Sequence, residues 1–289
     1  ATVLQAVEAI KEELRQRIIR SLIGFGGAFL IALIFANEFW KIISAPAVAA
    51  LTNLGFSPKL VAIAPMEQFS IIWMKVPMIV SIFLASPVIV YQIWGFISPG
   101  LYKRERKWAL PFIVCTSGLF ILGGLFAYYV VFRFGLEFLL GLGRDANVAP
   151  MVTISEYFDL FVNVTLGVAL VFELPVVIFF LTLIRIASPK FLLEKSRYAI
   201  LAIVVLAAIV TPTPDIFNLT MFTVPMLILY FVGVFASYLL ELNREGKKMP
   251  IPMLIGVVLA IAVILGGTGW LVAAKFGYHL INHWPFLAK

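Results

Sequence analysis

Seven long apolar runs constrain the fold of this chain more than any other feature of its sequence. A helix needs about 20 mostly apolar residues to cross roughly 30 Å of hydrocarbon. Because the strands of a membrane barrel would alternate apolar and polar residues, these continuous runs predict spanning helices. The predicted spans cover residues 18–35, 71–97, 109–132, 158–184, 198–210, 217–240 and 251–274.

The composition agrees with an all-α integral membrane protein. Of the 289 residues, 62% are apolar and 13% are charged, whereas a soluble domain carries about 25% charged residues. This excludes a soluble globular domain, a disordered chain and a nucleic-acid-binding module. The single cysteine, Cys115, excludes an intrachain disulfide. No small-residue cleavage site follows the first run, so we expect a retained helix there.

The fifth run is short and ends abruptly. Its 13 residues, 198–210, make a helix of roughly 20 Å, which is less than the hydrocarbon thickness. The sequence TPTPD follows at once and cannot continue a helix. The run is therefore either a short span that thins the bilayer locally or half of a re-entrant hairpin, and the charges on both flanks favour the short span.

The basic residues predict the orientation. Of the 22 lysines and arginines, 15 lie on one side of the predicted spans, and this side is expected to be cytoplasmic. The N-terminus is then cytoplasmic and, with seven spans, the C-terminus is external. The loops at 36–70 and 133–157 face outside and are long enough to form caps with short helices. Lys75 lies inside a span, close enough to its outer edge to snorkel.

No catalytic or metal-binding motif is recognisable. The sequence contains no P-loop, no GxSxG, no His-Glu-x-x-His and no Cys/His cluster, so we expect neither an enzyme nor a cofactor. His279 and His283 have the spacing of a helical metal pair. A solvated pair at the membrane interface is the simpler interpretation.

Glu173 is the most informative single residue, because it lies near the middle of the fourth span. A carboxyl group there costs at least about 2.5–3.5 kcal/mol on insertion, so it must be neutral, hydrated or paired with another polar group. Pro175 loosens the helix next to it. Glu173 is either a structural hydrogen-bonding group of the bundle or a polar point for interaction or proton transfer.

Two carboxylates lie among basic residues on the predicted cytoplasmic side. Glu13 is in KEELRQR and Glu105 in LYKRERKW. Each alone would be interpreted as a weak local ion pair. Together they offer two anionic points suited to guanidinium groups. Elsewhere, prolines punctuate the spans and favour kinked, tilted helices in a concave array, and Asp215 is expected to cap a helix.

The sequence ASPVIVYQIWGFISPGLYKRERKW resembles the signature of the TatC family, the multispanning subunit of the twin-arginine protein translocase. EELRQRI, SAPAV, PMEQF, FELPV and TPTPDIF resemble further elements of the family, and the resemblance covers about residues 10–243. It implies a concave array of six kinked transmembrane helices. We therefore expect a TatC-like membrane domain at 1–243 and a C-terminal extension at 244–289 that contains a seventh span.

The resemblance also implies a function. Family members recognise signal peptides that carry paired arginines on folded cargo, recruit single-span subunits of the TatA and TatB types, associate into a larger complex and use the proton-motive force. They reside in the cytoplasmic membrane of prokaryotes. The residues that the resemblance assigns to the signal-peptide site are Glu13, Arg15, Phe96, Pro99, Leu101, Tyr102, Glu105 and Arg106.

Other positions follow from the same resemblance. Glu173 matches the intramembrane position associated with partner helices, and Pro46, Glu67 and Asp215 are candidates for a structural or functional role on the outer side. The sequence departs from the family at Ile10, where a histidine is usual, and in its seventh apolar run. The alternative function is a proton-coupled small-molecule transporter that uses Glu173 as proton carrier.

Overall fold

The computed structural model describes residues 3–97, 109–142, 150–211, 215–246, 279–280 and 287–288. Within these ranges five helices are long and apolar enough to cross a membrane, and a sixth apolar helix is shorter. The prediction of an all-α membrane protein with kinked spanning helices is confirmed. The predicted seventh span, at 251–274, lies outside the described residues.

The helices of the first half are one long span, a cap and two further spans. They are α1 (Val3–Ile34), α2 (Ala36–Asn53), α3 (Pro65–Ser70), the π-helical segment η1 (Ile71–Lys75), α4 (Val76–Ile97), α5 (Ala109–Phe126), the π-helical segment η4 (Ala127–Phe132) and α6 (Arg133–Gly141).

The second half consists of a broken span, a short helix and a hairpin. Its elements are α7 (Ile154–Phe172), α8 (Leu174–Leu183), α9 (Pro189–Glu194), α10 (Ser196–Val210) and α11 (Ile216–Arg244). Two short strands, β1 (His279–Leu280) and β2 (Leu287–Ala288), pair antiparallel. His279 lies in β1, and His283 lies outside the described residues.

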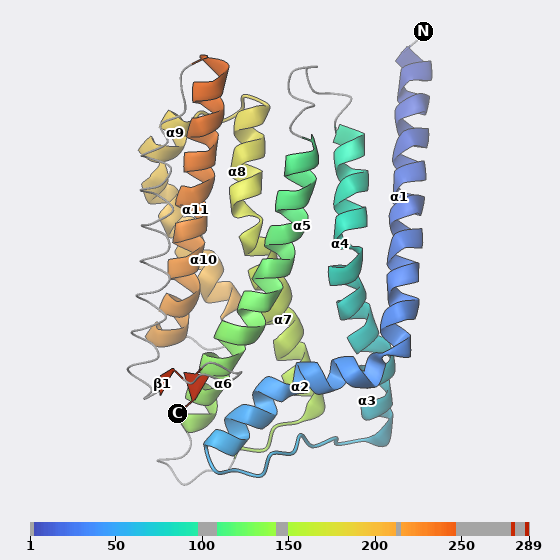
Figure 1. Ribbon diagram of the computed structural model, residues 1–289, viewed down its shortest axis with the longest axis vertical. Coiled ribbons are helices and arrows are strands. Elements are labelled where there is room, and N and C mark those ends of the chain that lie inside the picture. The colour runs from blue at the N-terminus through green and yellow to red at the C-terminus, as the bar shows by residue number, and fades with distance from the viewer. Residues whose placement is uncertain are drawn as a thin grey trace.

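The spanning helices stand side by side in an open array, with α1 at one edge (Figure 1). The main contact of α1 is with α4. Only 6% of the apolar window of α1 is buried, against 44% for the span formed by α7 and α8. We call the side that holds the N-terminal end of α1 and the last residues of α4, α8 and α11 the N-terminal side. The side that holds α2, α3 and α6 is the α2 side.

Helix α10 confirms that the fifth span is short. Its 15 residues make a helix of about 22 Å. It runs from the N-terminal side to the α2 side, and α11 returns over the full height of the array (Figure 1). The helix is therefore a short crossing and not half of a re-entrant hairpin.

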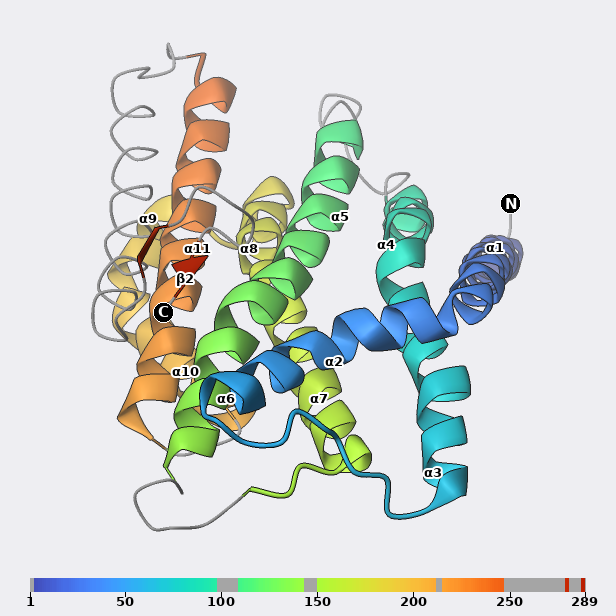
Figure 2. The same ribbon diagram turned by 60° about the horizontal axis from the view of Figure 1, so that its bottom comes forward.

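Helix α2 lies across the ends of the spanning helices and packs against α4, η4 and α6 (Figure 2). Its end needs a glycine. Gly55 has a φ of 78°, and the N–H groups of Gly55 and Phe56 donate to the carbonyls of Thr52 and Leu51. This left-handed termination satisfies the free carbonyls at the end of the helix. The loop at 36–70 thus forms the predicted cap, and α2 is the helix of this cap.

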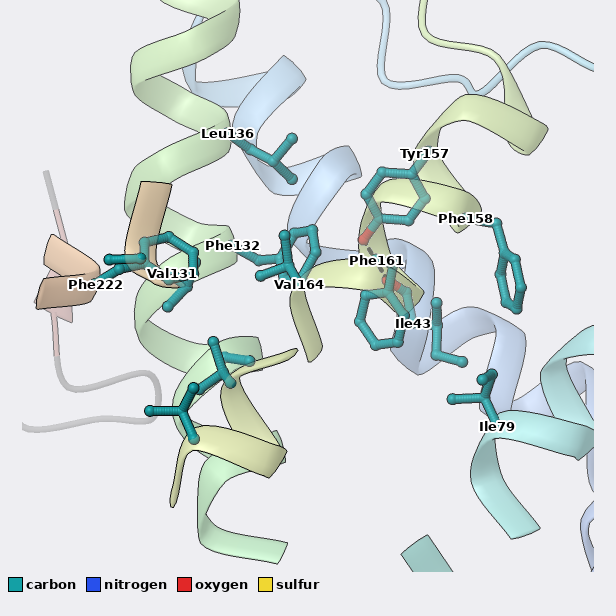
Figure 3. Packing of buried hydrophobic residues seen from close by; sticks show 14 of the residues in the cluster. Ile43, Ile79, Val131, Phe132, Leu136, Tyr157, Phe158, Phe161, Val164 and Phe222 are labelled. Atoms are coloured by element: carbon teal, nitrogen blue, oxygen red, sulfur yellow. Dashed lines mark hydrogen bonds between the residues drawn. The ribbon is translucent and has the colours of Figure 1, made fainter. Parts of the chain in front are cut away.

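The main hydrophobic core lies beneath α2, where η4, α6 and α7 meet it (Figure 3). Tyr157 and Phe158 are almost completely buried there. The Phe132 ring contacts Phe161 with centroids 5.1 Å apart and meets Tyr157 edge to face at 6.2 Å. Aromatic pairs in these geometries stabilise beyond the area they bury. The core therefore fixes α2 on the array.

Candidate functional site

The first candidate site is a corner on the N-terminal side, where α1 passes α4. Glu13 and Arg17 are one helical turn apart on α1. The Arg17 guanidinium donates from Nη2 and Nε to Oε1 of Glu13, at 2.7 and 3.1 Å. The Glu13 side chain is 41% exposed and that of Arg17 is 21% exposed. The corner thus presents an accessible carboxylate that already binds a guanidinium.

The Arg17 guanidinium rests against α4 at Gly95. A Cβ atom built on Gly95 would lie 2.0 Å from Arg17 Nη1. A larger residue at this position would make the flexible Arg17 side chain move away from the α4 backbone, so the glycine permits this close approach. Gly95 is therefore the feature of α4 that accommodates Arg17.

An open groove of about 580 Å³ extends from this corner between α1 and α4. Gln92 also lines it, and its Oε1 atom is buried with no hydrogen-bond partner in the described part of the chain. A buried acceptor without a donor loses hydration and gains nothing in exchange. The other groove residues are Leu14, Ile18, Ser21, Leu22, Phe25, Ile82, Ile89, Ile93, Phe96 and Ile97.

The structure places three of the residues predicted for signal-peptide binding. Glu13 is at the corner, Phe96 lines the groove, and Arg15 is exposed with a long ion pair of 3.5 Å to Glu12. The other predicted residues, Pro99, Leu101, Tyr102, Glu105 and Arg106, lie outside the described residues. The structure thus brings Glu13 and Phe96 to one corner and leaves the pairing of Glu13 with Glu105 untested.

The second candidate site is the break between α7 and α8, where Glu173 lies. Pro175 has no N–H group and cannot donate to the carbonyl of Val171, so the helix is interrupted at this point. The N–H of Glu173 donates to Leu170 at 3.1 Å. Within the described chain, Oε1 of Glu173 is buried without a hydrogen-bond partner. The carboxyl group therefore has an unused acceptor at the middle of a span.

On the α2 side, two tyrosine hydroxyls donate across helices to consecutive carbonyls of α2, and Pro46 explains the first of these bonds. Pro46 lacks the N–H group that would donate to the carbonyl of Ile42. The hydroxyl of Tyr128, from η4, donates to this carbonyl at 2.8 Å. The buried hydroxyl of Tyr157 donates to the next carbonyl, of Ile43, at 2.5 Å (Figure 3). Pro46 is thus a structural residue of the cap, since it frees an acceptor that Tyr128 uses.

The remaining outer-side candidates cap helices. The Glu67 carboxylate accepts from the N–H groups of Ile63 and Ala64 at 3.0 and 3.3 Å, at the start of α3. Asp215 accepts from the N–H of Asn218 at 2.7 Å and from its side-chain amide at 2.8 Å. Asp215 therefore caps α11, as the sequence predicted.

Lys75 forms an ion pair that the sequence did not predict, and its side chain is 46% exposed. Its ammonium group is 3.3 Å from Oδ1 of Asp159 on α7 and 5.9 Å from the centre of the Phe158 ring. An opposite charge and an aromatic face lie close enough for the ammonium to interact with both. Lys75 thus connects η1 to α7.

Three residues of the N-terminal corner, Arg17, Gln92 and Gly95, were not predicted from the sequence. The spacing of Glu13 and Arg17 is a signal for a pair on one helix face. By contrast, nothing in the sequence indicates that Gly95 lies under Arg17 or that Gln92 shares its groove. No group of three or more potential metal-binding side chains occurs among the described residues.

The tilted apolar helices and the polar corner define a multi-span membrane protein with an open groove at one side of the array. The family model of the Sec-independent protein translocase protein (TatC) matches residues 9–225. The chain belongs to the TatC family, whose members are receptor subunits of a protein translocase and not enzymes. The resemblance found in the sequence is confirmed.

Individual relatives match most of the chain. The TatC protein of Koribacter versatilis is 40% identical over 82% of this chain and 86% of its own length. That of Carboxydothermus hydrogenoformans is 38% identical over 82% and 95%. The crystal structure of a twin-arginine translocase receptor, TatC, has a TM-score of 0.66 at 32% identity and covers 80% of this chain and 98% of that one. None of these comparisons supports the small-molecule transporter.

Proposed function

We propose that this TatC protein is the core receptor of a twin-arginine translocase and that it binds paired-arginine signal peptides at the corner of α1 and α4. The observation that carries the proposal is the Glu13 carboxylate, which is accessible and already binds a guanidinium. The solved relative is a twin-arginine translocase receptor. A second guanidinium, from cargo, suits the same carboxylate because charge-assisted hydrogen bonds to arginine are strong and directional.

The groove suits the remainder of such a peptide. Its walls are largely aliphatic and aromatic, and an apolar peptide segment that lies there removes its surface from water. Phe96 shapes the groove, and Pro99, Leu101 and Tyr102 shape the loop that presents Glu105 as the second anionic point. Arg15 and Arg106 complete the site, where they set the local charge around the two carboxylates.

Glu173 is proposed as a contact for the transmembrane helix of a single-span partner of the TatA or TatB type. The support is its buried, unpartnered carboxyl oxygen at a helix break. Within hydrocarbon a polar group of a neighbouring helix is the available partner for such an oxygen. Recruitment of these subunits, self-association into a larger complex and transport driven by the proton-motive force belong to the same proposal.

The N-terminal side is proposed to face the cytoplasm of a prokaryote, with the C-terminus external after a seventh span. The support is the distribution of lysine and arginine along the chain. A cysteine at Ala288 in a Cys115→Ser background tests this topology. We expect a membrane-impermeant thiol reagent to label it from the outside, and labelling only from the cytoplasmic side would refute the topology. Truncation after Lys248 should leave a folded protein.

Binding of a synthetic peptide with an adjacent arginine pair tests the receptor function. Glu13→Gln and Glu105→Gln keep the side-chain shape and remove the charge, and each should weaken binding by about 1–3 kcal/mol. The matched control is Glu38→Gln. Glu38 is also an exposed glutamate paired with a cation on its own helix, Lys41 at 2.9 Å, but it lies on α2. Unchanged affinity in both Glu13→Gln and Glu105→Gln would contradict the assignment.

A further inference from the structure

The proposed receptor carboxylate is not empty. Arg17 donates two hydrogen bonds to one oxygen of Glu13, Oε1. These are the bonds that a cargo guanidinium would make, because the internal and the incoming groups are chemically identical. A cargo guanidinium that bound Oε1 of Glu13 in the same way would compete with Arg17 for this oxygen, and the like charges of the two guanidinium groups repel each other at this distance.

The internal bond is weak enough to be exchanged. Both side chains are partly exposed to solvent, and the residues are one turn apart on the same helix. Pairs of this kind contribute little to stability, because solvent screens them and both side chains lose rotamer freedom. Replacement of Arg17 by another guanidinium on Glu13 therefore costs the protein little.

A displaced Arg17 has an acceptor nearby. Gln92 precedes Gly95 by three residues on α4, so both lie on the same face of that helix. Gln92 is 9% exposed and its Oε1 atom has no partner in the described residues. Gln92 and Arg17 line the same groove. A guanidinium that leaves Glu13 and moves along α4 would satisfy this buried oxygen.

We propose that Arg17 is an internal stand-in for the cargo arginine, which displaces it from Glu13 into the α1–α4 groove, where Gln92 accepts its hydrogen bond. A peptide must therefore bind Glu13 more strongly than Arg17 does. A peptide with two guanidinium groups meets this requirement more easily than a peptide with one. This inference rests on the proposed receptor function and adds a specificity-determining residue to it.

The first experiment measures the affinity of the full-length protein, in detergent micelles, for the arginine-pair peptide. Arg17→Gln removes the competitor, and we expect affinity to rise about two- to five-fold. Arg20→Gln is the control, since it removes the same charge from an exposed position one turn further along α1. A rise of the same size in Arg20→Gln, no change in Arg17→Gln or a loss in Arg17→Gln would overturn the stand-in.

The second experiment combines Arg17→Gln with Gln92→Leu. Gln92→Leu removes the acceptor for the displaced arginine, so affinity should fall about two- to five-fold in the presence of Arg17. It should not change in the Arg17→Gln background, where no guanidinium is displaced. Equal losses in both backgrounds, or no loss in either, would contradict the transfer to Gln92.

Two further measurements separate the possible failures. The thermal unfolding midpoint of Gln92→Leu should not fall, because the substitution removes an unsatisfied buried oxygen; a large fall would contradict the assignment of this oxygen as unpartnered. If the wild-type protein does not bind the arginine-pair peptide more tightly than a lysine-pair peptide, the receptor function itself is refuted. Normal wild-type binding with an unresponsive Arg17→Gln variant would refute only the stand-in.

Discussion

The corner under α2 and the corner between α1 and α4 use polar groups in opposite ways. Under α2, Tyr128 donates to the carbonyl that Pro46 leaves free, and Tyr157 donates to the carbonyl that follows. Between α1 and α4, Gln92 keeps a buried oxygen without a partner, and Glu13 holds an arginine through an exposed bond. The corner under α2 thus pairs these acceptors with donors inside the protein, whereas the corner between α1 and α4 leaves a buried acceptor unpaired.

This difference indicates where the molecule is rigid and where it exchanges partners. The buried bond between Tyr157 and Ile43 is costly to disturb because no water can replace the lost donor, whereas the bond between Tyr128 and Ile42 is more exposed. Groups at an open groove can change partners at small cost. The α2 corner therefore holds the helices in place, and the α1–α4 corner is suited to reversible binding.

The largest effect is expected for Tyr157→Ala in the α2 corner. The side chain is almost completely buried, and truncation of a buried aromatic costs about 3–5 kcal/mol of folding free energy. Equilibrium unfolding in detergent micelles measures this loss. Tyr157→Phe is the matched control and should lose only about 1 kcal/mol, for the hydroxyl bond to Ile43.

The peptide affinity of the same variants tests whether the two corners are independent. The folded fraction of Tyr157→Phe should bind the arginine-pair peptide like the wild type, because Tyr157 lies in the core beneath α2 and the groove opens between α1 and α4. A large loss of affinity in the folded protein would mean that the two corners are coupled and that the division between them is wrong.

Substitution of Glu173 is expected to have an intermediate effect, on association with a partner subunit, which substitutions in neither corner should change. Glu173→Ala should leave folding and peptide affinity near normal and weaken association with a single-span partner by about 0.6–2 kcal/mol, the range for polar contacts between helices in membranes. Co-purification with the partner subunit measures this. Glu173→Gln should be milder, because an amide still forms hydrogen bonds.

Two outcomes would change the interpretation of Glu173. If Glu173→Ala prevents folding in the membrane, the carboxyl group is a structural element of the α7–α8 break. If Glu173→Gln is as damaging to transport as Glu173→Ala while partner association remains intact, proton transfer explains the residue better. Glu156→Ala, at the first turn of α7, is the control for loss of a carboxylate from the same helix.

The smallest effect on unfolding free energy is expected for Tyr128→Phe, and its size should depend on whether residue 46 is a proline. Tyr128→Phe removes the donor to Ile42 and should cost about 1 kcal/mol of unfolding free energy. In a Pro46→Ala background the new N–H can donate to Ile42 itself, so the same substitution should cost less there. Unfolding of the four variants measures this coupling, and equal costs in both backgrounds would show that Tyr128 does not compensate for the proline.

Much of the fold could be predicted from single segments of the sequence. The apolar runs predicted the spanning helices, because insertion depends on the hydropathy and length of one segment at a time. The shortness of α10 and the cap at Asp215 followed from residues adjacent in sequence. Glu173 was recognisable because any carboxyl group at the middle of a span requires a partner.

The tertiary structure alone decided which residues meet across helices. Gly95 is nearly 80 positions from Arg17, Tyr128 is 86 from Ile42, and Lys75 is 84 from Asp159. Where the Arg17 guanidinium rests on α4, and which carboxylate Lys75 pairs with, depends on such contacts. The physical reason is that hydropathy is a property of one segment, whereas a hydrogen bond or a close approach depends on the tilt and rotation of two helices. The sequence alone therefore determined the spans and the family of this protein, and packing decided which of its polar groups remain available to a partner.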